Sequence, residues 1–175
     1  TVTPNGNVIA ADSVSVGLKE IPFSGGVYLT PSPLLDRNGN AIDLYGDAPC
    51  LATDANDDLF FLLDNGMNDQ PVQELQFNAG YYQSSAQTIA TMGVGSCSGI
   101  AVDSNQNVFV TTNGVVYELP FSGGTYGAAI TLNTDSGDFR GMAVDGNGDV
   151  FVADSTNNVV TEIPFANGSY GTPIT

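Results

Sequence analysis

A short pattern recurs four times along this chain and constrains its fold more than any other feature. In each copy, a four-residue turn rich in Asn, Asp or Gly is followed by an apolar run such as Val-Phe-Val. These runs begin at Val8, Leu59, Val108 and Val150, so the copies are 51, 49 and 42 residues apart. Repeats of this length indicate an array of similar small units that pack on their neighbours.

A second block ends each copy and shows what the unit is. It reads Glu, then an aliphatic residue, then Pro or Gln, then Phe. A Tyr follows five residues after the Phe. The four blocks begin at Glu20, Glu74, Glu118 and Glu162. In the third copy Val115, Tyr117, Leu119 and Phe121 alternate with other residues, which is the period of a β-strand.

Each copy therefore predicts four short strands, the last of them around the Tyr. No window shows sustained helical spacing, so we predict an all-β chain. Four-stranded antiparallel units at this period are typical of β-propeller blades. We expect a β-propeller with four blades in this chain, at about residues 1–31, 50–90, 98–132 and 141–175, and an insertion at about 32–48.

The fourth copy resembles the NHL-type β-propeller repeat. The matching residues run from Asp145 to Asp154 (DGNGDVFVAD) and continue at Asn158-Val159-Val160. The resemblance implies disc-like propellers, usually of six blades, in a family that includes sensor ectodomains, binding scaffolds and a few enzymes. Four copies leave three arrangements open: a four-bladed ring, a piece of a longer propeller or tandem array, or several associated chains that cover each other's end blades.

The net charge of the chain limits the kinds of partner that it can bind. The chain has three Lys and Arg against 19 Asp and Glu, a net charge of −16. Nucleic-acid binding needs the opposite sign, and an anionic membrane repels such a surface. The longest strongly apolar stretch, Leu59 to Leu63, is too short to span a bilayer. We therefore expect a protein partner or further copies of the chain, with no nucleic acid and no membrane insertion.

Two features bear on the compartment. Cys50 and Cys97 are 47 residues apart, about one repeat, so neighbouring blades would bring them close. A disulfide is one interpretation and two buried free thiols are the other; the disulfide would indicate an extracellular or cell-surface protein. Asn167-Gly168-Ser169 matches a glycosylation sequon, although an Asn-Gly turn also explains it.

The turns raise the question of calcium. Acidic and amide side chains alternate in three of them, a spacing that opens calcium-binding loops. The candidate ligands are Asp54 with Asn56, Asp103 with Asn105, and Asp145 with Asn147. Asp36, Asn38 and Asn40 repeat the spacing in the insertion. No Glu stands at the twelfth position of an EF-hand loop, so we favour hairpin turns and keep calcium as the alternative.

Catalysis has few candidate residues. The chain has no His, which excludes a Ser-His-Asp triad within these residues. We expect the four repeated Glu residues to be solvated or inter-blade positions, each repeated Phe to fill the gap between blades, and each Tyr to lie at the rim. The sequence favours a non-enzymatic extracellular propeller that binds partners or builds structure, in a self-associating form. A calcium-dependent lactonase-like hydrolase is the alternative.

Overall fold

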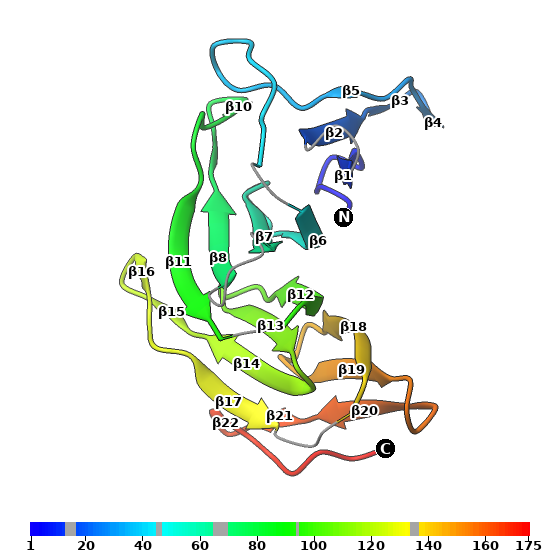
Figure 1. Cartoon of the computed structure of the whole chain (residues 1–175), viewed down its shortest axis with the longest axis vertical. Coiled ribbons are helices and arrows are strands. Elements are labelled where there is room, and N and C mark those ends of the chain that lie inside the picture. Colours follow the sequence, from blue (N-terminus) through cyan, green and yellow to red (C-terminus); the bar gives the residue numbers. More distant parts are fainter. Residues whose placement is uncertain (13–16, 45–46, 65–69, 94, 134–136) are drawn as a thin grey trace.

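The computed structural model describes residues 1–12, 17–44, 47–64, 70–93, 95–133 and 137–175. Every regular element in these ranges is a β-strand. The longer sheets, four antiparallel sheets of three or four strands, follow in chain order as blades 1 to 4 and fan around an arc rather than a closed ring (Figure 1). The prediction of an all-β propeller with about four strands per blade is confirmed.

Blades 2 and 3 are the complete ones. Blade 2 contains, from the inside outwards, β6 (Asp47–Thr53), β7 (Leu59–Asp64), β8 (Gln70–Leu75) and β11 (Gln87–Met92). Blade 3 contains β12 (Cys97–Val102), β13 (Val108–Thr112), β14 (Val115–Leu119) and β17 (Ile130–Asn133). Their innermost strands lie side by side on the concave side of the arc (Figure 1).

Blades 1 and 4 are three-stranded, and isolated bridges extend both of them. Blade 1 contains β1 (Val8–Asp12), β2 (Gly17–Ile21) and β5 (Ser32–Pro33). Blade 4 contains β18 (Phe139–Val144), β19 (Val150–Asp154) and β20 (Val159–Ile163). Val2 bridges to Val8 on the inner side of blade 1, and Ile174 bridges to Glu162 on the outer side of blade 4.

The prediction of a fourth strand around each Tyr is wrong. The Tyr instead returns to its Phe in a hairpin with two-residue arms that follows the third strand. These hairpins are β3–β4 (Phe23–Ser24, Val27–Tyr28), β9–β10 (Phe77–Asn78, Tyr81–Tyr82), β15–β16 (Phe121–Ser122, Thr125–Tyr126) and β21–β22 (Phe165–Ala166, Ser169–Tyr170).

A tight turn explains this short hairpin. Both central turn residues have positive φ, as at Gly123 (61°) and Gly124 (84°), the geometry of a two-residue hairpin loop. The residue after each Tyr then donates its N–H to the carbonyl before the Phe, as Gly127 does to Pro120 at 2.8 Å. Ring centroids of the paired Phe and Tyr lie 4.8–5.0 Å apart. The outermost strand begins only after this closed unit.

One apolar cluster fills each of the three gaps between blades. Ile9 and Leu18 of blade 1 pack against Leu59, Phe61 and Leu75 of blade 2. The second gap is filled from both sides by residues of blades 2 and 3. The third gap holds Phe109 and Val116 of blade 3 against Val150, Val152 and Ile163 of blade 4. The core is therefore distributed between sheets, so each inner blade is buried on both faces.

The insertion belongs to the first of these clusters. Leu34, Ile42 and Leu44 are buried beside Ile9 and Tyr82. The backbone N–H of Leu34 donates to Leu18 at 2.8 Å, which fixes the segment beside β2. Residues 45 and 46 of the predicted insertion lie outside the described residues. These three apolar side chains help to close the gap between blades 1 and 2, whereas residues 37–41 form an exposed loop that projects beyond the blades (Figure 1).

A disulfide joins Cys50 of β6 to Cys97 of β12, with the two Cα atoms 6.0 Å apart. It links the innermost strands of two neighbouring blades, and both cysteines are buried. Within the ranges given above, no helix is long and apolar enough to cross a membrane.

Candidate functional site

The predicted calcium ligands build four similar turns. Asp54, Asp103 and Asp145 directly follow the innermost strands of blades 2, 3 and 4. In each turn one carboxylate oxygen accepts backbone N–H groups from the residues two and four positions later, at 2.8–2.9 Å. Asp36 accepts from Asn38 and Asn40 in the same way. These are Asx turns, in which the carboxylate takes the role of a backbone carbonyl.

The amide side chains face the aspartates as donors. Asn56 Nδ2 donates to Asp54 Oδ2 at 3.1 Å, and Asn147 Nδ2 donates to Asp145 Oδ2 at 3.2 Å. In the turn of blade 3, the side chain of Asn107 makes this contact with Asp103 in place of the predicted Asn105, which contributes its backbone N–H. Each turn thus brings its own Asp and Asn together, whereas the three turns stay on three different blades.

The pattern of donors decides what these carboxylates do. Their oxygens accept N–H groups of their own loops, and Asp54 Oδ2 also accepts from Gln106 Nε2 in the turn of blade 3, at 3.2 Å. In the part of the chain that the structure describes, no group of three or more His, Cys, Asp or Glu side chains is placed to hold a metal ion. Calcium binding stays a prediction for experiment.

The last residue of each turn has a role that the sequence analysis missed. Asn7, Asp58, Asn107 and Asp149 each accept, through the side chain, the backbone N–H of the repeated Phe. The donors are Phe23, Phe77, Phe121 and Phe165, at 2.5–2.8 Å. This bond ties the first turn of a blade to the end of its third strand. Its signal in the sequence is the Asp or Asn that ends every turn, paired with a Phe in every copy.

The repeated glutamates differ in burial between the inner blades and the end blades. Glu74 and Glu118, on the inner blades, are buried, whereas Glu20 and Glu162 are partly exposed. Burial raises the pKa of Glu74 and Glu118, and nearby Asp58 and Asp103 respectively add to it. The inner pair therefore occupies inter-blade positions, where a charge is costly.

The repeated tyrosines do not all lie at the rim. Tyr82 is buried, and Tyr126 and Tyr170 are only partly exposed, because each reaches the blade before its own. Burial raises the pKa of all three phenols, so they stay protonated at neutral pH. The repeated Phe residues, expected to fill the gaps, pair with the Tyr rings of their own hairpins, and Phe77 also packs against the cluster between blades 1 and 2.

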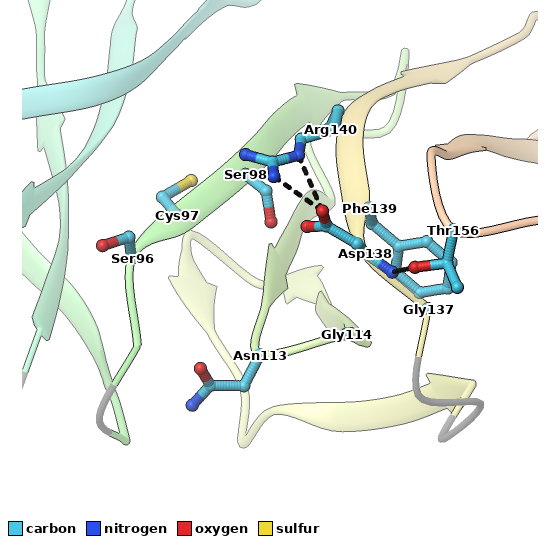
Figure 2. Close-up of a pocket in the computed structure, with 10 residues that line it drawn as sticks. All are labelled: Ser96, Cys97, Ser98, Asn113, Gly114, Gly137, Asp138, Phe139, Arg140 and Thr156. Atoms are coloured by element: carbon cyan, nitrogen blue, oxygen red, sulfur yellow. Dashed lines mark hydrogen bonds and ion pairs between the residues drawn. The ribbon is translucent and has the colours of Figure 1, made fainter. Parts of the chain in front are cut away.

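A polar cavity of about 600 Å³ lies between blades 3 and 4, at the opposite end of β12 and β18 from the Asx turns (Figure 2). Ser96 and Ser98 line one side and Asp138 and Arg140 the other, with Asn113 at the β13–β14 turn. Arg140 pairs with Asp138 at 2.6 Å. The sequence analysis did not predict this site, because its walls come from strand starts and turns far apart in the chain.

The cavity can hydrogen-bond a polar ligand. Asp138 is already engaged by Arg140 and by the Ser155 hydroxyl, at 3.0 Å. The exposed ion pair contributes little to stability.

Asn167, the predicted glycosylation site, lies exposed at the tip of the β21–β22 hairpin. Its φ of 54° is the left-handed value that the tight turn requires.

Comparison with known proteins identifies the fold. No protein-family model matches the chain, and a search of curated proteins gives no match. Solved structures do match. A gluconolactonase from Xanthomonas campestris aligns with a TM-score of 0.65 and 12% identity, over 97% of this chain and 58% of that one. A virginiamycin B lyase from Staphylococcus aureus aligns with a TM-score of 0.59 and 16% identity, over 99% and 53%.

The WD40 repeats of RRP9 align as well, with a TM-score of 0.64 and 13% identity, over 97% of this chain and 48% of that one. The chain thus spans about half the length of these propellers. The chain is a partial β-propeller. At such low identity the likeness shows the fold alone and leaves the function of this chain open.

Proposed function

We propose that this chain is a non-enzymatic propeller module, built of NHL-type repeats, that serves as a binding or structural scaffold at the cell surface or outside cells. The observation that supports this most is the use of the acidic side chains. Asp54, Asp103 and Asp145 each accept backbone N–H groups of their own turn, and so hold the hairpins of the blades.

The acidic residues support binding over catalysis. The carboxylates that the sequence offered for chemistry hold turns or lie between blades. The surplus of negative charge disfavours nucleic acid and anionic membranes as partners, which leaves proteins.

The disulfide supports the location. Disulfides persist in oxidising compartments and are rare in the cytosol, so Cys50–Cys97 favours an extracellular or cell-surface protein. An exposed Asn167 in a sequon is compatible with glycosylation there.

The proposal is tested against a calcium-dependent lactonase-like hydrolase, which the likeness to a gluconolactonase makes the relevant alternative. Calcium is titrated calorimetrically into the chelator-treated protein, and gluconolactone hydrolysis is followed with and without calcium. We expect no saturable heat and no hydrolysis above the uncatalysed rate. Saturable binding together with calcium-dependent hydrolysis, both lost in Asp103→Asn, would overturn the proposal.

A further inference from the structure

The insertion meets the short hairpin of blade 2 at the outer rim of the molecule, where its loop lies beside β10 (Figure 1). Asp36 forms a parallel bridge with Tyr82, and the backbone N–H of Arg37 donates to the Tyr82 carbonyl at 3.2 Å. Asp36 and Tyr82 are both buried. Because side chains alternate along an extended chain, the neighbouring Arg37 and Tyr81 lie on the outer side of this junction, and both are exposed.

A pocket of about 320 Å³ lies at this junction. Arg37 lines it from the insertion, and Asn78, Ala79, Tyr81 and Gln83 line it from blade 2. These residues offer a guanidinium, two amides and a phenol, and none of the described residues that line the pocket is acidic. The volume is near the lower end of the range for small-ligand pockets, about 300–1,000 Å³.

The hairpin of blade 2 departs from the repeat at the residues that line this pocket. The positions of Asn78, Tyr81 and Gln83 hold Ser122, Thr125 and Gly127 in blade 3 and Ala166, Ser169 and Gly171 in blade 4. These small residues form the same hairpin, so its fold does not require the larger side chains of blade 2. In repeat proteins, insertions that gather on one surface often mark the binding face.

The exposure of this hairpin follows from its place on the blade. Residues 122–125, the tip of the same hairpin in blade 3, are also exposed, although blade 3 packs against a blade on each side. The pocket is formed by blade 2 and the insertion, which pack together through Leu34 and Tyr82. At least one whole blade separates it from the outward faces of blades 1 and 4, so a blade added at either face would not cover it.

Arg37 is a positive charge without a partner in the described part of the chain. Lys19 and Arg140, the other two basic residues, each interact with another part of the chain, whereas the Arg37 guanidinium makes no hydrogen bond or ion pair with a described residue. The neighbouring Asp36 carboxylate accepts N–H groups of its own turn, at 2.8 and 2.9 Å. The planar fork of N–H donors on arginine matches the two oxygens of a carboxylate.

We propose that this pocket binds a carboxylate of a protein partner, together with an apolar side chain beside that carboxylate. Arg37 pairs with the carboxylate, and the amides of Asn78 and Gln83 add hydrogen bonds. The apolar group packs on the Tyr81 ring, 57% exposed, and on Leu35, which is 48% exposed on the same side of the chain as Arg37. This inference rests on the proposed binding function and gives the chemistry of the partner.

The charge of the chain selects among anions. Nucleic acids and anionic membranes carry many charges over a wide area, so they also meet the acidic surface of a chain with net charge −16. A single carboxylate meets only the pocket, because salt screens exposed charges more than about 8 Å away. The exposed Tyr81 and Leu35 favour a ligand with an apolar group over a free anion, and Tyr and Arg are enriched where proteins bind each other.

The first test compares three small ligands by NMR titration of the isotope-labelled protein. The signals followed are the Arg37 Nε–H and the side-chain amides of Asn78 and Gln83. N-acetylleucine has a carboxylate beside an apolar group, N-acetylleucinamide lacks the charge, and acetate lacks the apolar group. We expect N-acetylleucine to shift these signals saturably, with a dissociation constant of about 1–10 mM for so small a ligand.

The other two ligands bind more weakly, the amide by a factor of about ten or more, because it loses the charge-assisted hydrogen bonds. Amide binding equal to that of N-acetylleucine would show that the carboxylate is not recognised. Acetate binding of equal strength would assign the pocket to small free anions. Either result, or the absence of saturable shifts with N-acetylleucine, would overturn the proposal.

The second test changes the protein. Arg37→Gln removes the charge, and the triple variant Asn78→Ser, Tyr81→Thr, Gln83→Gly gives blade 2 the residues of blade 3. The control, Ser122→Ala with Thr125→Ser, gives the hairpin of blade 3 the residues of blade 4. We expect the control to bind N-acetylleucine like the wild type, and both pocket variants to bind it more weakly by a factor of about ten or more.

A pocket variant that binds like the wild type would overturn the proposal, provided that signals away from the pocket show the native fold. If a variant fails to fold, the comparison of ligands on the wild type still decides. Neither test involves calcium or hydrolysis, so failure of this inference leaves the scaffold function to its own test.

Discussion

Replacement of Phe109 by Ala lowers the unfolding free energy far more than replacement of Phe151, its counterpart on blade 4, if the blades pack as described. Phe109 is fully buried between blades 3 and 4 and packs edge-on against Tyr170. Phe109→Ala therefore loses the burial of a large side chain, leaves a cavity, and removes an aromatic pair, a loss of about 3–5 kcal/mol in unfolding free energy.

Phe151 holds the same position on blade 4, where its ring is partly exposed. Its ring is already partly in water in the single chain, so Phe151→Ala costs about 1 kcal/mol. The difference between the two variants measures what one covering blade contributes.

Urea unfolding followed by circular dichroism gives both values from the midpoint and slope. The measurement is made at low protein concentration, so that association does not stabilise the wild type or Phe151→Ala. Equal losses for the two variants, or a loss below about 1 kcal/mol for Phe109→Ala, would refute the face-to-face packing of blades 3 and 4.

Three further predictions concern single features. The Cys50–Cys97 disulfide closes a loop between residues 47 apart, so its reduction lowers the unfolding free energy by about 4 kcal/mol. A Cys50→Ala, Cys97→Ala double variant shows no response to reductant in the same urea assay. Ala79 has a φ of 55°, so Ala79→Gly raises the unfolding free energy by about 1 kcal/mol. Gly123→Ala, at the matching position of blade 3, lowers the unfolding free energy by about as much. Thermal unfolding in which both variants shift the midpoint in the same direction would contradict this. Burial raises the pKa of Glu118 above its ordinary 4.5, so its carboxyl is neutral in both states at low pH. Its cost to folding begins as pH rises above 4.5 and is complete above the folded-state pKa. Glu118→Gln therefore gains stability at pH 7 and loses this gain as pH falls to 4.5; equal urea midpoint shifts at both pH values would contradict this.

Local patterns in the sequence predict most of the fold. The continuous apolar run Val108–Val110 and the alternating residues of Val115–Leu119 predict two neighbouring strands. The Asp and Asn residues between the first two strands predict tight turns, and the structure shows the hydrogen bonds that form them. Such features depend only on residues a few positions apart, so they repeat in every copy.

Contacts between distant segments were harder to predict. The outermost strands β11 and β17 follow the Tyr hairpins at different spacings and share no motif. The sequence therefore marks the segment around each Tyr more clearly than it marks the outermost strand. The buried Leu34, Ile42 and Leu44 fall outside the repeat, and nothing in their pattern indicates which gap they fill. The cavity beside Ser98 and Arg140 depends on how two blades meet, which a single repeat does not encode.

An experimental structure of the protein tests the central claim most directly, namely that the Tyr of each later blade packs on an apolar residue of the blade before it. We predict that the rings of Phe109 and Tyr170 lie edge-on with centroids 6.2 Å apart, and that those of Phe60 and Tyr126 do so at 6.3 Å. A structure in which either pair of rings is apart would contradict the account.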